Sequence, residues 1–250
     1  MPTIRQVLQV GLLLAVAIPR RDAAQAPTLQ LDHVWIVVSA GAPERSALER
    51  AGLHVSPTVN RHDGQGTASV MAELTGGFIE LIWPDSTVDV APSSAVAFTK
   101  FRAKQAWRST GWSPFGIGLR RTSSAPDSLP FATWPIHADW MRPNESLDMI
   151  TARADTISPS VWVVPRSMAV GENSPSGQPR DQLNGTRRIT ALRLTVPASA
   201  SKVDAIELLA AYGIASIEHG TSWLLEITLD GARQGMRQDL RPVLPLVIRY

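Results

Sequence analysis

The sequence predicts an α+β protein built from repeated βαβββ modules, and three observations point to this class. An apolar, β-branched run at residues 31–38 is followed by a short helical pattern and by three more extended runs before Pro84. The same order of elements returns between residues 189 and 249. Hydrophobic residues make up 44% of the chain and charged residues 18%, which is the composition of a globular protein.

The first module spans residues 30–84. Its first strand, residues 31–38, is ended by Gly41 and Pro43. A helix over residues 43–53 has a proline near its start and Gly52 as its left-handed stop. Extended runs are expected at residues 55–58, 67–74 and 78–83, separated by a polar turn at 60–66 and a tight turn at 75–77.

Residues 85–185 are expected to hold a linker helix and a degenerate middle module. The helix begins at Ser93 or Ser94 and runs to about Arg108, with Phe98, Phe101 and Trp107 on its buried face. Strands are expected at residues 115–120 and 161–164. Residues 129–143, with two tryptophans, fit no simple element, and residues 169–185 have the composition of a long loop.

The C-terminal module spans residues 186–250. A strand at 189–196, a helix at 201–212 ended by Gly213, and strands at 215–218, 223–229 and 244–249 repeat the order of the first module. Laid over the first module, this segment aligns Glu226 with Glu80 and Ala191 with His33. Repetition on this scale indicates an internal duplication.

Residues 1–26 have the pattern of an export signal. Arg5 precedes an apolar run at residues 7–18, and Ala24-Gln25-Ala26 supplies a small-x-small cleavage pattern. We therefore expect a periplasmic or secreted protein. Arg20-Arg21 and Pro27 depart from the pattern and leave an uncleaved N-terminal membrane tether, or a wrongly assigned start, as alternatives. No other stretch is long and apolar enough for us to expect a membrane span.

The composition excludes several chemistries. The chain has no cysteine, so any metal must be held by His, Asp, Glu or backbone oxygen. The net charge is +2 and the arginines are scattered, which argues against nucleic acid as a partner. Gly64-Gln65-Gly66 is only a fragment of a dinucleotide fingerprint, so no nucleotide cofactor is expected. The expected partners are a small-molecule ligand and, in a homodimer, a second copy of the chain.

His33 and Glu80 are the leading metal candidates. In the strand period of two, each is flanked on its own face by apolar residues. A carboxylate in such surroundings is costly unless it is paired or bound to a metal. Imidazole and carboxylate together suit Zn, Fe, Mn, Co or Ni, and a buried His–Glu hydrogen bond or ion pair is the alternative.

Three motifs of the first module resemble the glyoxalase-like branch of the vicinal-oxygen-chelate (glyoxalase/bleomycin resistance/dioxygenase) superfamily. They are LDHV at residues 31–34, GQGT at 64–67 and GFIELI at 77–82, and the resemblance covers about fifty residues well. It implies paired βαβββ modules that form a half-barrel sheet around a divalent ion, which binds two vicinal oxygens of a substrate. It also implies that His33 and Glu80 are ligands from the first module.

The second half of the ligand set departs from the family pattern. A typical member takes two further ligands from its second module, where this chain has Glu226 but has Ala191 in place of a histidine. Glu226 or His137 is therefore the expected third ligand, and three protein ligands would leave a position open for catalysis. Many superfamily members have lost the metal and bind ligands in the same cavity.

Four further residues are candidates for the site. His62, in the polar turn, and His137 are weak candidates for a catalytic acid or base, because imidazole titrates near neutral pH. A solvated or packed histidine is the alternative for each. Trp134 and Trp140 lie outside any clear element and are candidate substrate contacts.

Three functions are consistent with these residues. The leading expectation is a glyoxalase-like lyase, isomerase or dioxygenase in which a divalent metal polarises a carbonyl or enolate oxygen of a small molecule. The alternative is a metal-free protein of the same superfamily that binds or sequesters a small hydrophobic compound. A scaffold or interaction module is the third.

Overall fold

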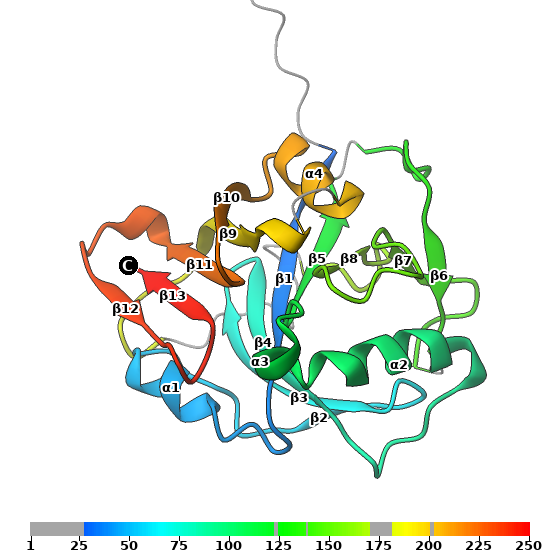
Figure 1. Cartoon of the computed structure of the whole chain (residues 1–250), viewed down its shortest axis with the longest axis horizontal. Coiled ribbons are helices and arrows are strands. Elements are labelled where there is room, and N and C mark those ends of the chain that lie inside the picture. The colour runs from blue at the N-terminus through cyan, green and yellow to red at the C-terminus, as the bar shows by residue number, and fades with distance from the viewer. Residues whose placement is uncertain (1–27, 123–124, 139, 171–181, 201–202) are drawn as a thin grey trace, which may run out of the picture.

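The computed structural model describes residues 28–122, 125–138, 140–170, 182–200 and 203–250. These residues form an α+β fold, mostly strands with few helices, with one eight-stranded and one five-stranded sheet (Figure 1). The predicted α+β class is confirmed, whereas the expected signal at residues 1–26 lies outside the described residues. Within the described ranges, no helix has the length and apolar character needed to cross a membrane.

The first half of the eight-stranded sheet comes from residues 29–84. Its elements are β1 (Leu29–Val37), α1 (Arg45–Arg50), β2 (Asn60–His62), β3 (Thr67–Leu74) and β4 (Gly77–Pro84). β1 runs parallel to β4, and the strand order is β2-β3-β4-β1. The predicted strand at 55–58 is wrong, because the second strand lies at Asn60–His62 within the expected polar turn. Its pairing with β3 supplies backbone hydrogen bonds that outweigh the polar composition.

The second half of the same sheet comes from the middle of the chain. Three helices come first in this segment: η1 (Pro92–Ser94), α2 (Ala95–Lys104) and α3 (Trp107–Thr110). The strands come after them: β5 (Phe115–Arg121), β6 (Trp134–Ile136), β7 (Leu147–Met149) and β8 (Ser160–Val163). Their order, β5-β8-β7-β6, repeats the order β1-β4-β3-β2 of the first half, and β1 pairs antiparallel with β5 at the centre. The described residues between β5 and β6 contain no helix. The result is a curled half-barrel, compatible with a vicinal-oxygen-chelate-like fold.

The C-terminal segment forms the five-stranded sheet instead of joining the half-barrel. Its elements are β9 (Ile189–Pro197), η3 (Ala198–Ala200), α4 (Asp204–Ala211), β10 (Ser216–Gly220), β11 (Leu224–Leu229), η4 (Asp230–Ala232), β12 (Arg237–Asp239) and β13 (Leu246–Arg249). The strand order is β10-β9-β11-β13-β12. The half-barrel therefore combines the first module with the middle of the chain and not with the C-terminal segment.

The two faces of the half-barrel bury separate cores. Along β1, Val34 and Ile36 belong to a large cluster that also contains buried residues of α1, α4 and the five-stranded sheet. Trp35 and Val37 point to the other face and belong to a smaller cluster with Phe101 of α2. This is the alternation expected of a strand buried on both sides. We call the first face the outer face and the second the inner face; α2 and the C-terminal sheet lie on opposite sides of β1 (Figure 1).

Candidate ligand-binding cavity

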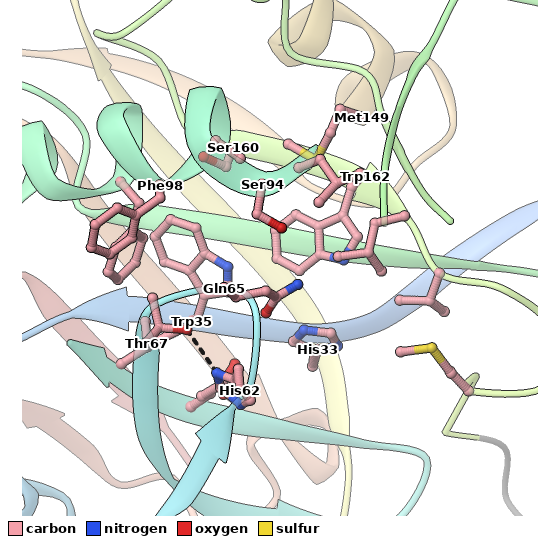
Figure 2. Close-up of a pocket in the computed structure, with 18 of the residues that line it drawn as sticks. His33, Trp35, His62, Gln65, Thr67, Ser94, Phe98, Met149, Ser160 and Trp162 are labelled. Carbon is pink, nitrogen blue, oxygen red and sulfur yellow. Dashed lines mark hydrogen bonds and ion pairs between the residues drawn. The ribbon is translucent and has the colours of Figure 1, made fainter. Parts of the chain in front are cut away.

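A cavity of about 260 Å³ lies over the inner face of the eight-stranded sheet. Its lining comes from both halves of the sheet and from α2, and most of it is apolar (Figure 2). Concave, largely apolar sites with a few convergent polar groups are where proteins bind small molecules. The geometry of those polar groups therefore decides what this cavity accepts.

Aromatic rings form one wall of the cavity. The ring centroids of Trp35 and Trp162 lie 5.9 Å apart with their planes at 25°, and Phe101 of α2 meets Trp35 edge-on at 5.6 Å. The indole of Trp35 fits because β5 carries glycine opposite it: a Cβ on Gly116 would lie only 2.0 Å from the Trp35 ring. The glycines of β5 are thus the reason why rings, and not side chains of β5, line this part of the cavity.

His33 and its neighbour Asp32 form a buried pair. Adjacent residues of a regular strand point to opposite faces, but the register of β1 with β5 shifts here, so Asp32 lies in a β-bulge. Nδ1 of His33 lies 2.6 Å from one carboxylate oxygen of Asp32, and the other oxygen accepts the backbone N–H of Val170 at 2.8 Å. The His33 ring stacks on Phe78 at 4.2 Å and meets the edge of Trp162 at 5.2 Å. Its orientation is therefore fixed from three sides.

His62 and Glu80 form a second polar pair. Nε2 of His62 lies 3.6 Å from a carboxylate oxygen of Glu80, which is only 6% exposed. Nδ1 of His62 lies 2.8 Å from the hydroxyl oxygen of Thr67, a contact drawn in Figure 2. The alternative of a buried His–Glu interaction is thus present, but with His62 as the partner of Glu80.

Trp134 and Trp140 both line the cavity. The indole Nε1 of Trp134 donates a hydrogen bond to the Thr151 carbonyl at 2.9 Å, and the guanidinium of Arg153 lies 4.5 Å from the Trp134 ring. Trp140 is 42% exposed. Both candidate substrate contacts therefore belong to the cavity wall, and their contact with a substrate stays a prediction.

Two other predicted residues lie elsewhere. Glu226 is in the five-stranded sheet, with carboxylate distances of 3.8 Å to Arg193 and 3.5 Å to Arg249. His137 is exposed, and its Nδ1 donates a hydrogen bond to the Glu145 carbonyl at 2.7 Å. The structure brings together His33, His62, Glu80, Trp134 and Trp140, but neither of the residues expected as a third metal ligand lines the cavity.

The donor set of the described residues does not fit a protein-held divalent ion. Among them, no three His, Asp or Glu side chains lie close enough together to hold a metal. His33 and Glu80 each contact a different partner, and the cavity-lining residues of β8 are Ser160 and Trp162. A catalytic zinc or iron site takes about three protein ligands. Metal ligation by His33 and Glu80 stays a prediction.

Sequence patterns alone do not place several residues of the site and its surroundings. Trp162 was assigned to a strand but to no site, because nothing in the sequence showed that β8 pairs with β5. Asp32 was part of a motif, but strand alternation placed it on the face away from His33. Phe98 and Phe101 were expected to be buried on the helix, and both line the cavity. The adjacent acid and histidine at 32–33 were the one signal available for the pair.

The comparisons with known proteins leave the site to be interpreted from its own geometry. No family model matches the sequence, and no curated protein matches it. Among solved structures, the chain is similar to one described as "Crystal Structure of a hypothetical protein from Staphylococcus aureus", at 12% identity and a TM-score of 0.48. That match covers 88% of this chain and 98% of the other.

Proposed function

We propose that this chain is a glyoxalase-like protein of the vicinal-oxygen-chelate type that binds a small, flat, largely apolar molecule without a metal ion. The observation that supports this most directly is the cavity wall. Aromatic rings from three elements, Trp35 of β1, Trp162 of β8 and Phe101 of α2, meet around one apolar space. Rings of this kind favour stacked or edge-on contacts with another ring.

The size and polarity of the cavity narrow the class of ligand. A volume of about 260 Å³ is just below the usual range for drug-sized ligands, so a molecule of one or two rings fits best. Most of the polar side chains that line the space come from the first half of the sheet, among them His33 and the His62–Glu80 pair. A ligand with one polar end and one apolar end matches this distribution.

Titration with ethylbenzene, monitored by calorimetry and by thermal unfolding, tests the proposal. For a ligand of this size we expect a dissociation constant on the order of 0.1–1 mM and a matching rise in the unfolding temperature. Ala97→Trp, which fills the cavity from α2, should weaken binding about tenfold or more. Ala95→Trp, at an exposed position on the same helix, should leave it unchanged. Absence of binding to the wild-type protein would contradict the proposal.

Metal analysis separates this function from the metalloenzyme expected from the resemblance. After loading with Zn, Fe, Mn, Co or Ni and dialysis, we expect well below one equivalent of bound metal, because two isolated donors hold a divalent ion weakly. Near one equivalent in the wild type, lost in both His33→Ala and Glu80→Ala, would support the metal-dependent lyase, isomerase or dioxygenase instead.

A further inference from the structure

His33 presents an unused hydrogen-bond acceptor to the cavity. An ionised carboxylate only accepts hydrogen bonds, so the proton between His33 and Asp32 belongs to Nδ1 of the imidazole. In the neutral ring Nε2 is then an acceptor. Within the described part of the chain, Nε2 of His33 has no hydrogen-bond partner. The ring lines the cavity, where Figure 2 shows it together with Trp35, His62 and Trp162.

Two of the donors that line the cavity already donate hydrogen bonds within the protein. The ammonium of Lys100 donates to the Ala152 carbonyl at 2.7 Å, and the hydroxyl of Ser94 donates to the His137 carbonyl at 3.0 Å. The carboxylate of Glu80 adds a second acceptor that faces the same space. A ligand group that contacts Nε2 of His33 or the carboxylate of Glu80 must therefore be a hydrogen-bond donor.

Resting on the proposed function, we propose that the Asp32–His33 pair makes this cavity selective for a ring-bearing molecule with a hydroxyl donor, a phenol or an enol. Its O–H donates to Nε2 of His33 while the ring packs against Trp162. Asp32 is a positioning residue: it holds His33 in the tautomer that accepts. A carboxylate-bearing ligand is disfavoured, because Glu80 and Asp32 already place negative charge at this end.

The bulge that contains Asp32 supplies a sharp test. One carboxylate oxygen of Asp32 accepts the Val170 N–H at 2.8 Å, a bond that only an oxygen can make. In Asp32→Asn the amide oxygen keeps that bond, so the amide NH₂ turns to His33 and donates to Nδ1. The proton of the imidazole then moves to Nε2, and the acceptor becomes a donor. The change alters polarity at Nε2 with little change in shape.

Calorimetric titrations with 4-ethylphenol and 4-ethylanisole at pH 8, where a phenol keeps its proton, measure the selectivity. 4-Ethylanisole carries a methyl group in place of the hydroxyl hydrogen of 4-ethylphenol, so it cannot donate a hydrogen bond through its oxygen. In the wild type we expect the phenol to bind about tenfold more tightly, the effect of one good hydrogen bond. In His33→Phe both should bind with similar affinity, because the acceptor is gone and the ring remains.

Asp32→Asn should reduce or reverse the preference for the phenol. The tautomer of His33 is read independently from two-dimensional ¹H–¹⁵N spectra, which we expect to show Nδ1–H in the wild type and Nε2–H in the Asp32→Asn variant. Equal affinities for the two compounds in the wild type would overturn this inference and leave the proposed function intact. Binding of neither compound would overturn both. An unchanged tautomer in Asp32→Asn would refute the positioning role of Asp32.

Discussion

Lys104 is a fully buried cation on the helix that covers the cavity. It is 1% exposed, and its ammonium donates to the carbonyls of Ser113 at 3.1 Å, Thr156 at 3.4 Å and Ser158 at 2.5 Å. Burial lowers the pKa of Lys104 to about 7, and the charge of Asp155 opposes this shift. Three protons thus meet three carbonyls, and this side chain joins α2 to the segments that precede β5 and β8.

Lys104 should make stability rise between neutral and alkaline pH. Between pH 7 and about 10.5 the unfolded chain holds the lysine proton and the folded chain does not, so raising the pH favours the folded state. Below pH 7 both states hold the proton and the contribution is constant. The free energy of unfolding of the wild type, relative to Lys104→Met, should therefore increase between pH 7 and 10 in urea titrations. Arg102→Met, exposed on the same helix, serves as the control, and a flat difference would refute the prediction.

Part of the candidate site could be predicted from the sequence, because two of its polar residues lie among apolar residues on strand faces. His33 and Glu80 interrupt apolar strand faces, which is visible without a structure, and both line the cavity. The pairing of Glu80 with His62 was not predictable, because β2 was expected to be a turn. The contact of Asp32 with His33 depends on a bulge, and one extra residue in a strand leaves no mark in the hydrophobic pattern.

The glycines of β5 leave the space that rings of the cavity wall occupy. A Cβ on Gly116 would lie 2.0 Å from the Trp35 ring, and one on Gly118 would lie 2.7 Å from Cε1 of His33. The indole of Trp35 is enclosed by Trp162 and Phe101, so it cannot move away freely. Two residues that do not line the cavity themselves therefore determine its shape.

Gly116→Ala should destabilise the protein by about 1–3 kcal/mol, the usual cost of overpacking a core. Chemical unfolding measures this loss, and tryptophan fluorescence should change because Trp35 is displaced. Combining it with Trp35→Phe, which shortens the clashing ring, should cost less than the sum of the two single changes. Strictly additive costs would show that the ring and the glycine do not depend on each other.

Strands with strong periodicity were predicted closely, and short strands were not. The expected strand at 67–74 coincides with β3 (Thr67–Leu74). The strands β6, β7 and β12 have three residues each and were missed. A three-residue strand carries too few alternating positions to be distinguished from a loop, and its existence depends on the neighbour that it pairs with.

The C-terminal sheet completes the molecule by covering the outer face of the half-barrel. Buried residues of β9, β11 and β13 belong to the same cluster as Val34 and Ile36 of β1. The segment between β5 and β6 takes part as well, since Phe131 meets Tyr212, next to α4, edge-on at 6.1 Å. The C-terminal module thus packs beside the half of the sheet whose described residues form no helix of their own.

Because the two sheets share one core, the protein should unfold in a single transition. Leu194→Ala in β9 removes a side chain that is 0% exposed and should cost about 2–5 kcal/mol. Circular dichroism and tryptophan fluorescence should report the same lowered midpoint. Arg193→Ala, whose side chain is 42% exposed, should cost less than about 1 kcal/mol. Two separate transitions would contradict the shared core.

The repeat in the sequence predicts the order of the elements, but it does not predict which segments join in one sheet. The overlay that aligned Glu226 with Glu80 compared segments that lie in different sheets. The middle of the chain, whose pattern is weaker, supplies the second half of the half-barrel. Strand pairing is set by tertiary packing, which a self-comparison of one sequence does not contain.

The two halves of the half-barrel contribute side chains of different polarity to the cavity. Most polar lining residues, among them His33, His62 and Glu80, come from the first half, whereas the second half adds mainly apolar side chains such as Met149 and Trp162. We therefore expect a molecule with one polar end to bind with that end toward the residues of the first half. In a series of ligands with methyl groups added at either end, additions that block the polar group should lower the affinity most, because they remove its hydrogen bond.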